Sequence, residues 1–162
     1  MRRLLFIFLL IIMALPIVLN AEWKPIRTIP TTPYSGDFTI WNGKIWQVDI
    51  VDCNIVSFDL EKEVKIMSIP TPGFYPYSVA IYKDTLIVSN KRVISFIDTN
   101  GNIYRSIHSP TPSITGLASD GTYIWVAEES GKIYCISTDD GITIKTFEGP
   151  GGKINGLAYS DG

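Results

Sequence analysis

The chain has 162 residues, enough for one domain, and 46% of them are hydrophobic and spread along the sequence. Charged residues make up 19%, below the usual share of about a quarter, and aromatic residues 12%, a composition that points to an all-β protein. The formal net charge is −2 and no basic patch stands out, which argues against a nucleic-acid partner.

The N-terminus has the layout of a secretory signal peptide. Arg2 and Arg3 precede an apolar run that ends at Leu19, and Ala21 offers a cleavage site. We therefore expect residues 1–21 to be removed and the mature protein to be secreted or otherwise extracytoplasmic, in the periplasm or at the cell surface. It would then have no membrane attachment. The alternative is an uncleaved anchor, but the run is shorter than the ~20 residues that a spanning helix needs.

Beyond this segment, three short phrases recur with a period of about forty residues. The clearest of them has an apolar third residue and is followed within three residues by a proline. Its four copies are Arg27-Thr28-Ile29, Met67-Ser68-Ile69, Arg105-Ser106-Ile107 and Lys145-Thr146-Phe147. Because several independent phrases keep one period, we interpret the chain as a repeat protein.

Each unit is predicted to contain four short antiparallel strands, A to D, and the three complete units span residues 37–69, 77–108 and 114–148. The expected strands are 37–41, 44–50, 54–60 and 64–69; 77–82, 85–90, 92–98 and 102–108; and 114–119, 123–128, 132–137 and 142–148. Hairpin dipeptides such as Asn42-Gly43 and Asp120-Gly121 agree with these bounds. A four-stranded unit repeating every ~40 residues predicts an all-β protein of the β-propeller class.

Partial units flank the three complete ones. Residues 24–29 match strand D and residues 154–159 match strand A. Propellers have about four to eight blades, so we interpret the sequence as a chain cut short of its natural end. A ring closed by several copies is the alternative, although it would leave a blade made of strands A and D only.

At residues 116–127 (GLASDGTYIWVA) and 131–134 (GKIY), the sequence resembles the secreted propeller repeats of the virginiamycin B lyase-like and glutaminyl cyclotransferase-like families. NHL-type and YncE-type repeats are similar. The resemblance covers about residues 27–162. It implies that the D–A and B–C loops share one face, where ligands dock.

Candidate site residues follow from that implied face. The residues aligned at the starts of the A strands are predicted to ring the mouth of the central channel: Asp37, Ser78, Thr115 and Asn155. The loops around them add Tyr34, Tyr75, Asp52, Arg92 and Glu128. The resemblance to lactonase-type propellers implies metal ligands at such positions, but only one carboxylate stands there. We therefore predict polar groups that hydrate the channel, with no metal and no cofactor.

Five further side chains are given structural interpretations. His108 is the only histidine and is expected on an exposed loop. Cys53 and Cys135 fall in units that are not neighbours, so no bridge is expected. Trp46 and Trp125 occupy equivalent places in strand B, and we assign both to the core between blades. No catalytic residue is predicted.

These observations favour a binding or scaffold propeller whose partner is a protein, a small molecule or a carbohydrate. The alternative is a propeller enzyme of the lyase, lactonase or glutaminyl cyclotransferase type, with catalytic residues partly in missing blades.

Overall fold

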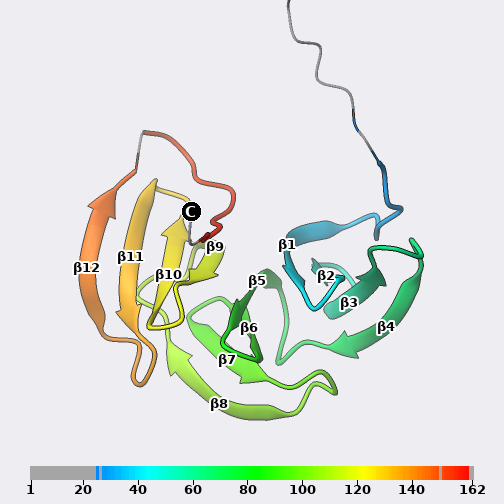
Figure 1. Ribbon diagram of the computed structural model, residues 1–162. Coiled ribbons are helices and arrows are strands. Elements are labelled where there is room, and N and C mark those ends of the chain that lie inside the picture. Colours follow the sequence, from blue (N-terminus) through cyan, green and yellow to red (C-terminus); the bar gives the residue numbers. More distant parts are fainter. Residues whose placement is uncertain (1–24, 26, 150, 161–162) are drawn as a thin grey trace, which may run out of the picture.

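Three four-stranded antiparallel sheets make up the computed structural model, which describes residues 25, 27–149 and 151–160 (Figure 1). The first sheet contains β1 (Ser35–Trp41), β2 (Lys44–Asp49), β3 (Asn54–Asp59) and β4 (Lys65–Pro70). The second contains β5 (Pro76–Tyr82), β6 (Thr85–Asn90), β7 (Val93–Ile97) and β8 (Ile103–His108). The third contains β9 (Ile114–Ser119), β10 (Tyr123–Glu128), β11 (Lys132–Ser137) and β12 (Thr143–Glu148).

The sheets are arranged as the blades of a propeller. Within each sheet the strands pair in chain order, and β1, β5 and β9 lie innermost while β4, β8 and β12 lie on the outside (Figure 1). The prediction of an all-β propeller is confirmed. Every strand begins and ends within two residues of its expected bounds.

The turn between β1 and β2 illustrates how the sequence determines these hairpins. Trp41 pairs with Lys44, which leaves a two-residue loop of Asn42 and Gly43. Both loop residues have positive φ, 50° and 68°. A type I′ turn requires this, and Asn-Gly accepts it at little cost.

The expected strand at residues 24–29 lies partly outside the described residues, and the expected strand at residues 154–159 is not formed. The described residues before Ser35 and those from Gly151 to Ser160 form no strand. A strand needs a hydrogen-bonded neighbour in a sheet, and these segments lie outside the three sheets. The expected signal peptide, residues 1–21, lies outside the described residues. Among the described residues, no helix is long and apolar enough to span a membrane.

The first core lies between the sheets β1–β4 and β5–β8. Trp46, Val48 and Ile55 of the first sheet pack with Leu86 and Val88 of the second. These residues alternate along their strands, so each strand contributes one face. Trp46 is 1% exposed, which confirms its assignment to the core between blades.

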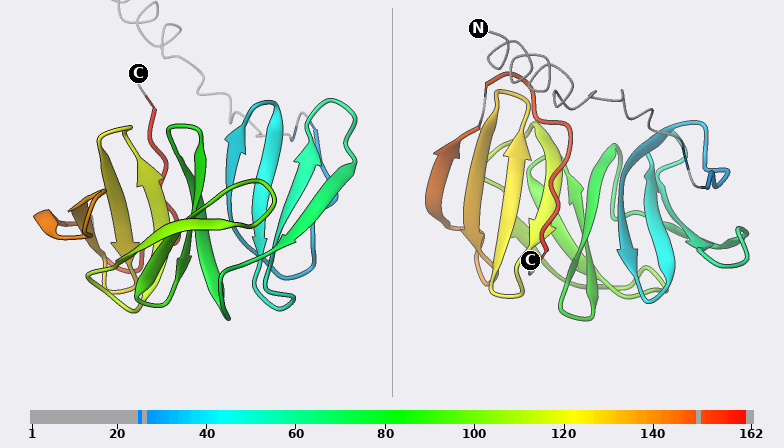
Figure 2. Two further views of the ribbon diagram at one scale, coloured as in Figure 1. Left: turned by 90° about the horizontal axis from the view of Figure 1, so that it is seen from below. Right: turned by 45° about the horizontal axis from the view of Figure 1, so that its top comes forward.

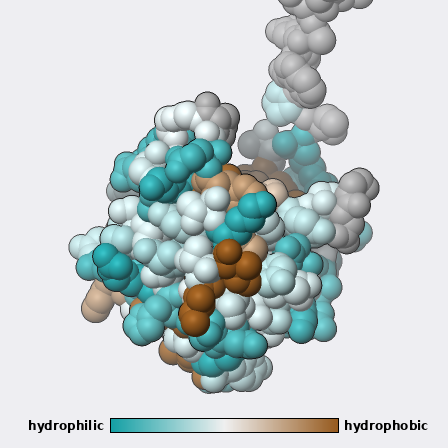
Figure 3. All heavy atoms as spheres, turned by 90° about the vertical axis from the view of Figure 1, so that its left-hand side faces the viewer, coloured by the Kyte–Doolittle hydropathy of each residue, from teal (hydrophilic) through white to brown (hydrophobic). Residues whose placement is uncertain are grey.

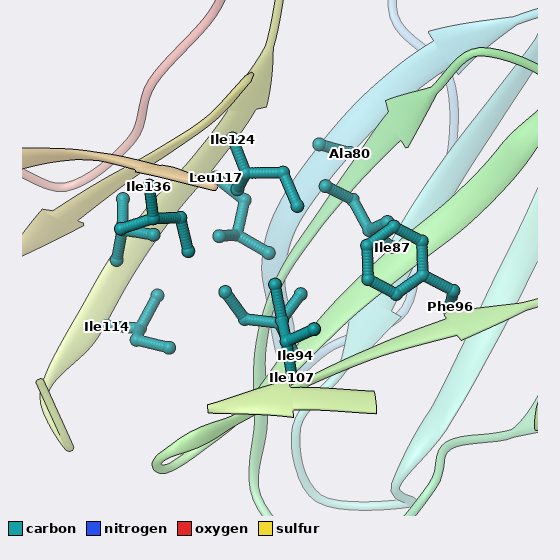
Figure 4. Close-up of a cluster of buried hydrophobic side chains, with 10 residues drawn as sticks. Ala80, Ile87, Ile94, Phe96, Ile107, Ile114, Leu117, Ile124 and Ile136 are labelled. Carbon is teal, nitrogen blue, oxygen red and sulfur yellow. The ribbon is translucent and has the colours of Figure 1, made fainter. Parts of the chain in front are cut away.

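The second core lies between the sheets β5–β8 and β9–β12 (Figure 4). Ile87 and Ile94 of the middle sheet pack with Leu117, Ile124 and Ile136 of the third. The middle sheet therefore buries both of its faces. This explains why the four central residues of β6, 86–89, are all buried and do not alternate between buried and exposed positions.

Trp125 differs from its counterpart Trp46. Its neighbours Ile124 and Val126 belong to the second core, so Trp125 lies on the opposite face of the third sheet. There it is half-buried, its ring centroid lies 5.6 Å from that of Phe147, and its Nε1–H donates to Asp120 Oδ2 at 2.9 Å. The prediction of an interblade core position is therefore wrong for Trp125, because no described sheet packs on that face.

Short segments nevertheless occupy the flanks of the end sheets in register with the repeat. The Arg27 guanidinium donates to the carbonyl of Leu60, and the Arg105 guanidinium of β8 donates to the carbonyl of Thr138 in the next sheet. Both contacts span 33 residues. Arg27 therefore contacts the first sheet in the same way as Arg105 of the outer strand β8 contacts the third sheet.

At the other flank, residues 153–160 run beside β9 (Figure 2). The approach is so close that a Cβ at Gly116 would lie 2.7 Å from the backbone nitrogen of Leu157. Only glycine fits there, because any other side chain would push the segment away.

The side of the molecule that carries β12 is mainly hydrophilic (Figure 3). It shows apolar side chains only as small separate groups. Ile142 and Ile144 are among the exposed apolar residues of this sheet. Scattered exposed apolar residues of this kind are normal on a protein surface.

The two tryptophans should respond differently to truncation. We expect Trp46→Ala to lower the free energy of unfolding by about 3–5 kcal/mol, as for buried aromatic residues generally, and Trp125→Ala to lower it clearly less. Urea unfolding of both variants, followed by far-UV circular dichroism, measures this difference. Equal losses would contradict the placement of the two rings.

Candidate functional site

The loops that follow the outermost strands meet the turns between the second and third strand of the sheet that they leave. Thr71 N–H donates to the Cys53 carbonyl at 2.9 Å, Ser109 N–H to that of Arg92 at 2.7 Å, and Gly149 N–H to that of Gly131 at 2.8 Å. This repeated contact brings both sets of loops to one edge of the molecule. We call this edge the loop face; it consists of residues 50–53, 91–92, 129–131, 71–75, 109–113 and 151–153.

A cleft of about 400 Å³ lies where the loop face meets the innermost strands. Its polar lining residues are Ser35, Asp37, Tyr77, Ser113, Thr115, Glu129, Lys153 and Asn155. A second cavity, of about 690 Å³, lies further along β1, β5, β9 and residues 156–159 and is lined mainly by apolar residues. Asp37 lines both, so it lies where the cleft joins the channel between the innermost strands.

Asp37 is held by hydrogen bonds that join all three innermost strands. Its Oδ1 accepts from Phe38 N–H at 2.9 Å, and its Oδ2 accepts from the Ser78 hydroxyl. The Ser78 oxygen in turn accepts from Leu117 N–H at 2.8 Å. The contact thus runs from β1 through β5 to β9.

Burial dominates the ionisation of this carboxyl. Desolvation raises the pKa of Asp37 above its ordinary value of 3.8, and hydrogen bonds from Ser78 and from the backbone of Phe38 and Leu117 offset only part of the effect. A carboxyl with a raised pKa in a cleft is typical of functional sites.

The four predicted channel residues come together, but not as strict equivalents. In register, Trp46, Ile87 and Trp125 pair with Thr39, Ala80 and Ala118, so Asp37 and Ser78 correspond to Gly116. Thr115 lies one position before that point. Asp37, Thr115 and Asn155 nevertheless line one cleft, and Ser78 touches Asp37.

None of the five predicted loop residues is among the residues that line this cleft. Tyr34 and Tyr75 are exposed and stand immediately before β1 and β5. Asp52 and Arg92 are exposed in the turns after β2 and β6. Within the described part of the chain, no hydrogen bond, ion pair or ring contact joins these four side chains to one another.

Glu128, at the end of β10, is the best-anchored of the predicted loop residues. Partial burial alone would raise its pKa, but hydrogen bonds from Ser130, Thr111 and Tyr134 outweigh burial and hold the pKa below its ordinary value. The same carboxylate, together with burial, raises the pKa of Tyr134. Glu128 is therefore ionised, and its carboxylate already accepts hydrogen bonds from side chains of this protein.

Sequence reasoning missed five polar residues of the cleft: Ser35, Tyr77, Ser113, Glu129 and Lys153. Lys153 Nζ lies 2.8 Å from Glu129 Oε1, which forms a salt bridge on the wall of the cleft. Tyr77 and Glu129 are direct neighbours of the predicted residues Ser78 and Glu128. Tyr77 and Glu129 could therefore have been predicted as site residues from their position next to Ser78 and Glu128.

Among the described residues, the Thr115 hydroxyl lacks the hydrogen-bond partner that a buried hydroxyl normally has. Its Oγ1 is buried and has no hydrogen-bond partner within the described part of the chain. Buried hydroxyl groups are usually hydrogen-bonded. The cleft that Thr115 lines is where a partner could be supplied.

Histidine and cysteine take no part in the cleft. His108 is exposed at the end of β8, as predicted, and Cys53 and Cys135 are both free. In the part of the chain that the structure describes, no three His, Cys, Asp or Glu side chains gather closely enough to hold a metal ion.

Solved structures with a similar fold include both natural and designed propellers. The WD40 repeats of RRP9 match 82% of this chain and 44% of that one, with a TM-score of 0.61 and 14% identity. A glutaminyl cyclase from Myxococcus xanthus matches 79% of this chain and 64% of that one, with a TM-score of 0.67 and 11% identity. The computationally designed Ika4 protein matches 86% of this chain and 88% of that one, with a TM-score of 0.58 and 12% identity.

These similarities show the fold. The chain is a β-propeller like those of the WD40 and glutaminyl cyclase structures, and it spans less than half the length of the RRP9 structure. No protein-family model matches the sequence, and neither does any curated protein.

The raised pKa of Asp37 predicts how stability depends on pH. The folded state holds its proton more tightly than the unfolded state, so stability should fall as the pH rises from 3.8 through the higher folded-state pKa. Asp37→Asn removes this titration. Its stability relative to the parent protein should therefore be lowest below pH 3.8 and increase toward neutral pH.

Urea unfolding at a series of pH values tests this. Asp59→Asn is a control of opposite sign, because a backbone hydrogen bond from Lys62 lowers the pKa of the exposed Asp59. Identical pH profiles for the parent and Asp37→Asn would show that Asp37 is not desolvated as described.

Proposed function

We propose that this propeller is an extracytoplasmic binding module that holds its ligand on the loop face, over the cleft beside Asp37. The observation that carries the proposal is the convergence of polar groups from three innermost strands in one cleft of about 400 Å³. Ligand sites in proteins are typically clefts of roughly 300–1,000 Å³ with a few convergent polar groups. The unpartnered Thr115 hydroxyl supports a role in ligand contact.

The construction of the loop face adds further support. Its loops are tied to the ends of the strands by the repeated backbone hydrogen bonds, so a rigid scaffold positions them. Binding residues are commonly presented in this way, on loops held by a rigid framework. The neighbouring solved structures contribute the fold to this proposal, not the ligand.

A fragment screen followed by protein-observed NMR tests the position of the site. We expect most binding compounds from a library of a few hundred small fragments to shift the amide signals of Gly36, Tyr77, Thr115 and Asn155. The opposite edge, where Asn42-Gly43 and Lys83-Asp84 form turns, is the internal comparison. Fragments that gather at those turns instead would place the binding site elsewhere.

The extracytoplasmic address rests on the apolar N-terminal run and needs its own test. A fusion of residues 1–40 to alkaline phosphatase, which is active only after export, should be active in a bacterial host. Leu10→Arg interrupts the apolar run and should abolish that activity. An inactive parent fusion would show that the segment is not an export signal.

A catalytic role for the cleft is a second candidate, favoured by Asp37. Its carboxyl is desolvated and lies at the junction of two cavities, where a general acid or base could act. If the cleft is catalytic, Asp37→Asn should abolish turnover of a substrate while leaving its binding intact. In a binding module, the same variant would alter only affinity.

A further inference from the structure

Four exposed aromatic side chains lie on the loop face or next to it, and one of them, Tyr77, lines the cleft. We call them the aromatic collar: Tyr34, Phe74, Tyr75 and Tyr77, which are 58%, 77%, 56% and 39% exposed. Tyr34 and Tyr75 immediately precede the innermost strands of their sheets, and Ser113, which lines the cleft, precedes β9 in the same way. The collar is therefore continuous along the chain with the polar lining of the cleft.

The loop that carries Phe74 and Tyr75 is fixed before any ligand arrives. Thr71 bonds to the Cys53 carbonyl through both its N–H and its hydroxyl, each at 2.9 Å. The Asn90 amide donates to the Pro72 carbonyl at 3.0 Å. A loop tied at these points loses little further conformational entropy on binding.

Tyr75 has an unusual backbone conformation. Its φ of 57° lies in the left-handed region, which is uncommon for a bulky residue. Such conformations persist where the surroundings determine them and gather at ligand-binding sites. The Lys91 ammonium lies 5.6 Å from the centre of the Tyr75 ring and further restrains it.

The cleft beside the collar offers mostly neutral hydrogen-bonding groups. Ser35 and Ser113 supply hydroxyls and Asn155 supplies an amide. Glu129 is already neutralised by Lys153, which leaves Asp37 as the one carboxyl without an opposite charge among the lining residues. A strongly charged ligand would find little to pair with.

Exposed aromatic rings together with neutral hydrogen-bonding groups suit a carbohydrate ligand. A sugar ring has an apolar face of C–H groups that stacks on aromatic rings, and a rim of hydroxyls that needs neutral donors and acceptors. We propose that the cleft and the aromatic collar together bind an oligosaccharide, with one unit in the cleft and the next stacked on Tyr75 and Phe74. This rests on the proposed function and names its ligand.

The test uses the full chain, expressed for export and purified, with four soluble tetrasaccharides as probes: cellotetraose, maltotetraose, chitotetraose and mannotetraose. We expect at least one of them to bind at millimolar concentration or below by calorimetry, and to shift the amide signals of Thr115 and Asn155. Tyr75→Gly should weaken that binding about tenfold, because one stacked ring is lost.

Glycine is chosen at position 75 because it accepts a φ of 57° without strain, so the variant should remain folded. Tyr104→Ala is the matched control. Tyr104 is an exposed aromatic residue on the outer strand β8, and its removal should leave the affinity unchanged.

Three outcomes would overturn the inference. The first is that no tetrasaccharide binds while fragments still bind the cleft, which would leave the proposed function standing with another ligand class. The second is that a tetrasaccharide binds equally well to the parent, Tyr75→Gly and Phe74→Ala. The third is that both the tetrasaccharides and the fragments bind at the opposite edge, which would end the proposed function as well.

Discussion

The packing of each sheet face against the next sheet is the constraint on which the rest of this molecule depends. A four-stranded antiparallel sheet has two faces, and a repeat of about forty residues provides an apolar set for each. The middle sheet shows the principle most fully, because Leu86 and Val88 face one neighbour while Ile87 and Ile94 face the other. Both cores converge on β1, β5 and β9, and this packing holds the innermost strands close enough for Asp37, Ser78 and Leu117 to be joined by hydrogen bonds.

The candidate site follows from that convergence. Asp37 loses water because β5 and β9 crowd against β1, and its hydrogen bonds recover only part of the loss. The loops that follow the outermost strands are bonded to the turns of the sheets that they leave, so rigid strands position the cleft and the aromatic collar. Strain at Tyr75 fits this arrangement, since the loop around it is fixed on both sides. A binding surface built in this way needs no large movement to receive a ligand.

The fold could be predicted from the sequence because the same pattern of four strands recurs in three units, so each unit supports the strand assignment of the others. Turn dipeptides such as Asn42-Gly43 fixed where hairpins close, and the strand bounds were correct within two residues. The register at the innermost strands could not be predicted so well, because each strand contains a bulge, before Phe38, Val79 and Gly116, that shifts one residue against its partner strand. The ungapped alignment therefore matched Thr115 with Ser78, although Gly116 corresponds to Ser78.

Trp125 was misplaced for a different reason: the repeat predicts which face a residue takes, but not whether a sheet covers that face. The Glu129–Lys153 salt bridge, 24 residues apart, depends on loop geometry that no local pattern encodes.

Hydrogen–deuterium exchange of the backbone amides tests the central claim most directly, since it reports which strands are protected by packing on both faces. The account predicts the slowest exchange in β6 and β7, whose sheet is covered on both sides, and faster exchange in the outer strands β4 and β12. Protection in β12 equal to or greater than that in β6 would contradict the stacking of three sheets with a doubly buried middle one.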